Sequence, residues 1–137
     1  MKRKTPKGKI DYTSLNIPPE KHEIATARFF VDRGLDVIFA RPSSIKGSNS
    51  PDFQMCGKNW ETKSPVGNSE RTYDDAFRKA LKQSRNIIFD LRRMSIISED
   101  KCLKVLRKKA LSPKLKTLLV ITKDGRLLTL KGKFDTI

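Results

Sequence analysis

The sequence predicts a mixed α/β domain in which helices cover a β-sheet. Three observations support this prediction. Segments with apolar residues at helical spacing alternate along the chain with short segments typical of strands. Their order is helix, three strands, helix, strand, helix and hairpin, which is typical of helices packed on a sheet. At 137 residues the chain is long enough for one hydrophobic core but not for two.

Residues 1–16 differ in composition from the rest of the chain. They contain five Lys or Arg residues and little apolar periodicity, so we expect a flexible basic arm there and a single folded domain over residues 17–137.

Pro18-Pro19 can begin a helix, because proline is tolerated in the first helical turn. Apolar residues then recur at helical spacing over residues 20–33, and Gly34 is expected to end this helix.

Three short strands are predicted next, over residues 35–40, 51–55 and 58–64. A polar loop over residues 42–50 separates the first two. Gly57 indicates a tight turn between the second and the third, with either Cys56-Gly57 or Gly57-Lys58 as its central pair.

Two further helices are predicted in the second half of the chain, over residues 73–85 and 98–110. Thr72 is expected to cap the first, because Asp75 follows it at the spacing of a capping box. Ser98 is expected to cap the second, because serine is a favoured N-cap residue. Basic side chains occupy the surface of the first of these helices outside its apolar face.

The remaining strands are predicted to complete the sheet. Residues 86–91 are apolar enough to form a central strand. Residues 115–122 and 126–130 read as two more strands, and Asp124-Gly125 between them is a strong hairpin signal. The chain contains no internal repeat.

The net charge of the chain is strongly positive, with 30 Lys or Arg residues against 15 Asp or Glu residues, a formal charge of +15. Such a surplus attracts polyanions, and a nucleic acid is the first candidate partner. A membrane is not expected, because no apolar run approaches the roughly 20 residues that cross a bilayer, and the basic N-terminus is not followed by the apolar segment of a signal peptide.

Cys56 and Cys102 lack metal-site or disulfide spacing, so we expect both to be packing residues.

Three charged residues lie in the predicted hairpin of the first three strands. Glu61 and Lys63 are two residues apart and should project to the same face, whereas Trp60 and Thr62 project to the other. Asp52 lies on the neighbouring strand, opposite or diagonal to that pair. Carboxylates that face one another repel unless a cation lies between them, and Mg²⁺ prefers such oxygen ligands. Lys63 could then orient or deprotonate a metal-bound water, or stabilise charge on a phosphate.

Glu23 lies on the apolar stripe of the first predicted helix, so its carboxylate needs a partner. It could be a further metal ligand or bind Lys63, or it could be a partly exposed charge at the edge of the stripe. The hairpin charges also have a simpler interpretation, which is a salt-bridged hairpin on a solvent-facing sheet surface. The apolar flanks of both strands, the net charge and the basic helix that comes after them favour the metal site.

Pro51-Asp52 and Glu61-Thr62-Lys63, in this order of elements, resemble the PD-(D/E)XK nuclease superfamily, whose members share an α-β-β-β-α-β core. More narrowly, WETKSPVGNS at residues 60–69, followed by QSRNII at 83–88 and DLRR at 90–93, resembles the C-terminal nuclease domains of contact-dependent growth inhibition toxins of the CdiA type, which attack transfer RNA. The resemblance is dense over residues 18–93. It implies a PD-(D/E)XK (restriction-endonuclease-like) core, with a mixed β-sheet flanked by helices.

The resemblance also implies roles for individual residues. It implies that Asp52 and Glu61 bind a divalent metal ion, with Glu23 assisting, and that Lys63 is catalytic. Gln83 matches a polar position that points at the site in many superfamily members, although an exposed helix glutamine is equally consistent with the sequence. The metal is expected to be Mg²⁺, with Mn²⁺ and Zn²⁺ as alternatives.

Further residues are expected to contact the polynucleotide, namely Ser64, Asn68, Arg71, Arg78, Lys82, Arg85, Arg92 and Arg93. Each of these cations could equally be a solvated surface charge, and the serine and asparagine could instead shape the loop and cap the helix. His22 is the only histidine, so a histidine-based ribonuclease mechanism would have to use it alone.

The leading functional prediction is a metal-dependent endonuclease that hydrolyses RNA, most of all transfer RNA, as a toxin domain. Such a toxin would act in the bacterial cytoplasm, delivered there as part of a larger secreted effector, and would have an immunity protein with an acidic surface. A DNA endonuclease of restriction, repair or junction-resolving type would use the same residues. A non-catalytic nucleic-acid-binding or phage module is the remaining alternative, but it would have no need of facing carboxylates that repel phosphate.

Overall fold

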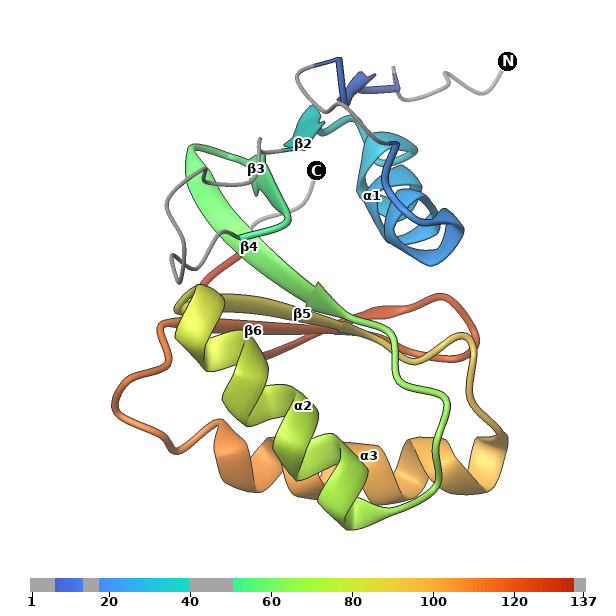
Figure 1. Ribbon diagram of the computed structural model, residues 1–137, viewed down its shortest axis with the longest axis vertical. Coiled ribbons are helices and arrows are strands. Elements are labelled where there is room, and N and C mark those ends of the chain that lie inside the picture. Colours follow the sequence, from blue (N-terminus) through green and yellow to red (C-terminus); the bar gives the residue numbers. More distant parts are fainter. Residues whose placement is uncertain (1–6, 14–17, 40–50, 135–137) are drawn as a thin grey trace, which may run out of the picture.

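The computed structural model describes residues 7–13, 18–39 and 51–134, and its strands form one mixed sheet with helices on both faces (Figure 1). The strands are β1 (Ile10–Asp11), β2 (Val37–Phe39), β3 (Phe53–Met55), β4 (Lys58–Lys63), β5 (Asn86–Asp90), β6 (Thr117–Ile121) and β7 (Leu127–Lys131). The helices are α1 (Lys21–Val31), α2 (Glu70–Gln83) and α3 (Ile96–Lys109). Neighbouring strands follow the chain order from β1 to β7. The predicted mixed α/β class is confirmed.

β4 lies in the middle of the sheet and joins its two halves. Its first residues pair antiparallel with β3, where Trp60 lies opposite Phe53. Its last residues pair parallel with β5, where Glu61 lies beside Ile87. In Figure 1, β4 runs from the part of the molecule that contains α1 to the part that contains α2 and α3. β4 therefore changes its pairing partner at Glu61, where the antiparallel and parallel parts of the sheet meet.

Successive residues of the central strands point to opposite faces, and each face has its own core. Ile88 of β5 packs with Phe30 of α1 and Trp60 of β4. Ile87 and Phe89 point the other way, into the core that α2 and α3 cover. All five side chains are fully buried. The two helical layers are therefore fixed to the same strands.

Residues 7–13 contradict the expectation of a flexible arm. β1 pairs in parallel with β2, and the N–H of Gly8 donates to the carbonyl oxygen of Val31 at 2.8 Å. A Cβ atom on Gly8 would lie 2.0 Å from the carbonyl oxygen of Leu35, so a glycine is needed for this close approach. Backbone pairing thus fixes a segment whose composition alone indicates mobility. The other residues of the predicted arm lie outside the described residues.

The predicted turns are confirmed, and one alternative is decided. Cys56 and Gly57 have φ values of 54° and 73°, so Cys56-Gly57 is the central pair of the turn between β3 and β4. Gly125 has φ 83° between β6 and β7, and Gly34 has φ 92° just after α1. The loop predicted over residues 42–50 lies outside the described residues.

α2 and α3 begin earlier than predicted. Ser69 is the N-cap of α2, and its hydroxyl accepts a hydrogen bond from the N–H of Arg71 at 3.2 Å. Ser95 is the N-cap of α3, and its hydroxyl accepts from the N–H of Ser98 at 3.2 Å. The predictions that Thr72 and Ser98 cap these helices are wrong, because an extended serine three residues upstream already binds the free backbone N–H groups. Among the residues described, no helix is long and apolar enough to cross a bilayer.

Candidate active site

Asp52 lies where β3 separates from β4. Its N–H donates to the carbonyl oxygen of Trp60 at 2.9 Å, which extends the pairing of the two strands by one residue. Its Oδ2 atom then accepts hydrogen bonds from the N–H and the hydroxyl of Thr62, at 2.9 and 2.7 Å. Oδ2 of Asp52 thus accepts the N–H of Thr62 where a backbone carbonyl oxygen would accept it in a continued strand pairing. These hydrogen bonds fix the carboxylate of Asp52 beside β4. Asp52 was expected on the strand that neighbours Glu61 and Lys63; it lies beside that segment of β4, but it precedes β3, which begins at Phe53.

Glu61 and Lys63 project to the same face of β4, as predicted, and Nζ of Lys63 lies 3.5 Å from Oε2 of Glu61. Glu61 is only 6% exposed, and its other oxygen, Oε1, is buried without a hydrogen-bond partner. Burial raises the pKa of Glu61 to about 7, and the charge of Asp52 adds to the rise while that of Lys63 opposes it. β4 therefore holds a buried carboxylate with one unpaired oxygen next to Asp52.

The first turn of α1 brings Glu23 to the same region. Burial raises the pKa of Glu23, a hydrogen bond from the backbone of Glu20 lowers it, and the charge of Asp52 raises it again. The charge of Glu23 in turn raises the pKa of Glu61. Oε1 of Glu23 accepts the hydrogen bond from the N–H of Glu20 at 3.0 Å, which forms a capping box at the start of α1. Carboxylates from α1, from β4 and from the residue before β3 thus act on one another electrostatically.

The structure does not gather the predicted metal ligands around one point. Within residues 7–13, 18–39 and 51–134, one group of three residues has candidate ligand atoms all within 4.8 Å of one another, and it consists of Glu20, His22 and Glu23. Nδ1 of His22 lies 3.3 Å from Oε2 of Glu20. Glu20 was not singled out from the sequence, although its capping-box spacing from Glu23 could have indicated the contact. A metal site formed by Asp52, Glu61 and Glu23 stays a prediction.

The chemistry of these predicted ligands nevertheless fits a hard divalent cation. All three are carboxylates, which Mg²⁺ prefers, and Oε1 of Glu61 is a buried oxygen without a protein partner. Burial and mutual repulsion raise the pKa values of Glu61 and Glu23. A cation near both groups would favour their ionised forms instead. The residues present are therefore compatible with a bound divalent metal ion.

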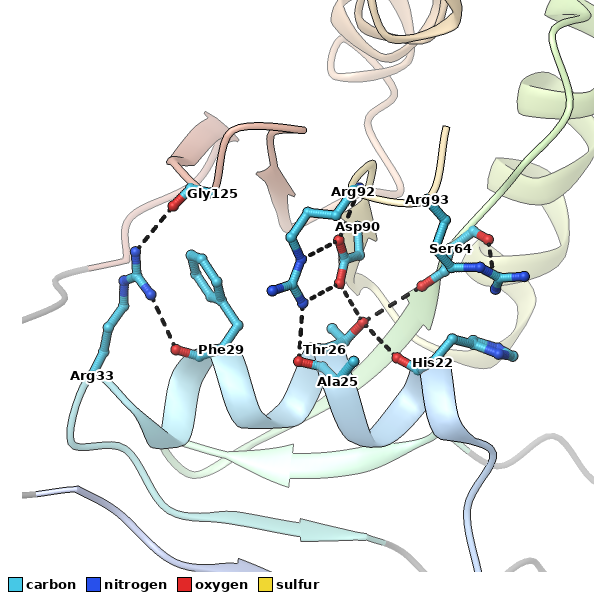
Figure 2. A network of polar contacts seen from close by, with 10 residues as sticks. All are labelled: His22, Ala25, Thr26, Phe29, Arg33, Ser64, Asp90, Arg92, Arg93 and Gly125. Carbon is cyan, nitrogen blue, oxygen red and sulfur yellow. Dashed lines mark hydrogen bonds and ion pairs between the residues drawn. The ribbon is translucent and has the colours of Figure 1, made fainter. Parts of the chain in front are cut away.

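A buried polar network fixes α1 against the end of β5 (Figure 2). The hydroxyl of Thr26 donates to Oδ2 of Asp90 at 2.7 Å. Arg92 binds the same carboxylate twice, from Nε to Oδ1 at 2.9 Å and from Nη2 to Oδ2 at 2.7 Å. Nη2 also donates to the carbonyl oxygen of Ala25 at 2.9 Å. Asp90 is 3% exposed, so a buried charge is fully paired here, and the network holds the helix that carries Glu23.

Two arginines predicted to bind nucleic acid make internal contacts. Arg92 belongs to the buried network, and Nη1 of Arg93 donates to the carbonyl oxygen of Ser64 at 3.1 Å. The hydroxyl of Ser64 lies 3.5 Å from that of Thr26, so it adjoins the same network (Figure 2). These three residues shape the exit of β4, and their contact with nucleic acid stays a prediction. Sequence reasoning missed Thr26 and Asp90, because no local pattern links residues so far apart.

The other predicted nucleic-acid contacts lie on or beside α2. The exposed ones are Asn68, Arg71, Lys82 and Arg85. Arg78 is also exposed, but its Nη2 lies 2.7 Å from Asp74 and 3.0 Å from Asp75. Part of the charge of Arg78 is therefore balanced within the helix. Contact of these residues with nucleic acid stays a prediction.

Gln83 was predicted to point at the site. It is the last residue of α2, and the hydroxyl of the next residue, Ser84, donates to the carbonyl oxygen of Asn59 at 2.7 Å. This end of α2 therefore lies beside the start of β4, whereas Lys63 is the last residue of that strand. A catalytic role for Gln83 stays a prediction.

Comparison with known proteins identifies the family. Residues 49–127, more than half of the chain, match the family model described as the contact-dependent growth inhibition CdiA C-terminal domain. The chain belongs to the CdiA C-terminal domain family. The match includes Asp52, Glu61 and Lys63 but not α1, which carries Glu23. The narrower resemblance drawn from the sequence is thereby confirmed at the level of the family.

A solved structure has a similar fold. It is the CdiA-CT/CdiI toxin and immunity complex from Burkholderia pseudomallei, with a TM-score of 0.66 and 21% sequence identity. The similarity covers 90% of this CdiA C-terminal domain and 99% of that chain. No curated protein sequence matches the chain.

Proposed function

We propose that this CdiA C-terminal domain is a toxin that hydrolyses phosphodiester bonds in RNA, transfer RNA above all, with a divalent metal ion such as Mg²⁺. The observation that supports this most is the arrangement on β4, where Lys63 pairs with the buried Glu61 beside an Asp52 that Thr62 holds in place. The order α1, β2, β3, β4, α2, β5 agrees with the α-β-β-β-α-β order expected of a PD-(D/E)XK core. A net charge of +15 suits a polyanionic substrate.

Each residue of this arrangement has a role in the proposed reaction. Asp52 and Glu61, with Glu23 from α1, would hold the metal ion, which when bound polarises phosphate and lowers the pKa of water. The ammonium of Lys63 lies next to Glu61, where it would orient the attacking water and stabilise negative charge on the scissile phosphate. Thr62 keeps the carboxylate of Asp52 in a fixed position while these groups act.

A toxin of this kind implies an immunity protein as its partner. The similar solved structure is a complex of a toxin with an immunity protein. Because this chain is strongly cationic, an acidic surface on the immunity protein would fit it. We expect the domain to be delivered as part of a larger secreted effector and to act in the bacterial cytoplasm, where transfer RNA is found.

The test incubates the chain with total RNA, with a transfer RNA transcript and with plasmid DNA, each with Mg²⁺ or with a chelator. We expect the RNA substrates to be cut with Mg²⁺ and to stay intact with the chelator. Cutting of DNA but not RNA would replace the proposal by a DNA endonuclease. Unchanged cutting in chelator would exclude the metal, and binding without any cutting would indicate a non-catalytic module.

A further inference from the structure

An open groove of about 480 Å³ lies between the segment that comes after β4 and the face of α2 that carries Thr72, Asp75, Ala76 and Lys79. Lys63 lines this groove, and the same lysine pairs with Glu61 in the candidate active site. The groove therefore opens directly beside the residues proposed for catalysis. Its volume falls within the range of about 300–1,000 Å³ that is typical of small-ligand sites.

The groove combines apolar surface with positive charge. Pro65, Val66 and Ala76 supply apolar surface, and Val66 is 58% exposed. Lys63 and Lys79 supply the positive charge. A nucleotide has the complementary character, because its base is a flat π-surface and its phosphate is an anion. The lining therefore has the chemistry of a nucleotide site.

The other polar groups of the groove are compatible with an anion. Asp75 lines it, but Oδ1 of Asp75 accepts a hydrogen bond from Nη2 of Arg78 at 3.0 Å. This ion pair reduces the repulsion that an approaching phosphate would meet. Thr72 adds a hydroxyl group, which can donate to a phosphate oxygen or accept from a ribose hydroxyl.

Hydrogen bonds fix one wall of the groove at two points. Nη1 of Arg93 donates to the carbonyl oxygen of Ser64 at 3.1 Å. The hydroxyl of the buried Tyr73 donates to the carbonyl oxygen of Gly67 at 2.6 Å. A wall that is already ordered loses little conformational freedom when a ligand enters, so the groove is preorganised for binding.

We propose that this groove holds a single unpaired nucleotide of the substrate, next to the phosphodiester bond that is cut. This inference rests on the nuclease function proposed above. Lys79 binds the phosphate of that nucleotide, and Val66 packs against its base. A base within a duplex would first have to unstack and unpair, at an energetic cost. The chain therefore prefers RNA whose target nucleotide is already single-stranded.

The first test measures binding without reaction. Each of the four ribonucleoside 5′-monophosphates is titrated into the metal-free chain, and backbone amide signals are followed by NMR. We expect the largest shifts at Gly67, Ala76 and Lys79, and an affinity about tenfold lower in Lys79→Ala and in Val66→Asp. Lys104→Ala is the matched control, because it removes the same charge from an exposed position on α3. Shifts confined to other surfaces, or equal losses in Lys79→Ala and Lys104→Ala, would overturn the inference.

The second test measures cleavage of a single-stranded oligoribonucleotide and of the same sequence in a duplex. We expect the single strand to be cut faster, and Lys79→Ala to raise KM more than it lowers kcat. Equal cutting of both forms, with no mononucleotide binding, would overturn the groove site and leave the nuclease proposal in place. A chain that cuts no nucleic acid but binds mononucleotides beside Lys79 would overturn the nuclease proposal and leave nucleotide binding in place.

Discussion

The hydroxyl of Thr26 on α1 donates a 2.7 Å hydrogen bond to Oδ2 of Asp90 at the end of β5, across 64 residues of sequence. Arg92 neutralises the same buried carboxylate and also binds the backbone of α1. This contact joins the helix that carries Glu23 to the strand that pairs with the second half of β4. The contact therefore helps to fix the position of Glu23 relative to the residues on β4.

Thr26→Val should lower the free energy of unfolding by about 1–3 kcal/mol, because the buried Asp90 loses a donor. Asp90→Asn should cost more, on the order of 3–5 kcal/mol, because it leaves the guanidinium of Arg92 without its counter-ion. Urea unfolding of the metal-free chain measures both. Thr26→Ser keeps the hydroxyl and is the control. A loss of stability in Thr26→Ser but not in Thr26→Val would show that the methyl group, not the hydrogen bond, is what matters.

The stability of the metal-free chain should depend on the ionisation of Glu61. Its pKa rises on folding from an ordinary 4.5 to about 7. Below pH 4.5 the carboxyl is protonated in both states and stability is unaffected. Between pH 4.5 and 7 the native state binds the extra proton, so stability falls as the pH rises, and above pH 7 the whole penalty is present.

Glu61→Gln should therefore stabilise the metal-free chain at pH 8, on the order of 2–3 kcal/mol, and change little at pH 4. Urea unfolding at the two pH values measures this difference. Glu70→Gln removes an exposed carboxylate and is the control, with an expected change within about 0.5 kcal/mol. A loss of stability in Glu61→Gln at pH 8 would mean that its pairing with Lys63 outweighs its burial.

In the proposed nuclease mechanism, Lys63→Ala should reduce kcat for RNA cleavage by about 10²–10⁴-fold, because it removes the ammonium group that lies beside Glu61. The affinity for an uncut transfer RNA should change much less, because Lys63 is one of 30 Lys or Arg residues in a chain whose overall charge attracts the polyanion. Single-turnover cleavage and filter binding separate the two quantities. Lys104→Ala should leave both near the wild-type values. A parallel loss of binding and cleavage in Lys63→Ala would assign Lys63 to substrate positioning.

The two cysteines should differ in reactivity. Burial raises the pKa of Cys102 to about 12, and this residue is fully buried, whereas Cys56 is exposed in the turn between β3 and β4. Iodoacetamide at pH 8 should modify Cys56 alone in the native chain, and Cys102 only after unfolding in urea. Mass spectrometry counts the added groups, and Cys56→Ser should take up none while folded. Rapid modification of Cys102 in the native chain would contradict its burial.

Local patterns were enough to predict how the residues of the candidate site that lie near one hairpin are arranged. Glu61 and Lys63 share a face because side chains alternate along any strand, and Gly57 indicated the turn that brings Asp52 alongside. The two helix caps were misassigned, because several serine and threonine residues near each helix start could cap it. Which one does so depends on where the chain leaves the preceding strand.

Long-range contacts were out of reach of such patterns. β1 is held by backbone groups of β2, which carry no side-chain signature in the sequence. Arg92 looked like one surface cation among many, and its role became clear only with Asp90 and Thr26 in place. The contact of Glu20 with His22 likewise depends on how the chain enters α1.

The exchange of pairing partners along β4 has a consequence for folding cooperativity. Trp60 anchors this strand in the core beneath α1, and three residues later the strand runs beside Phe89, which belongs to the core beneath α2 and α3. If the layer of α1 or the layer of α2 and α3 unfolded, the other layer would lose the strands on which it packs. The chain should therefore melt in a single all-or-none transition, and fragments cut at the turn after Met55 should not fold separately.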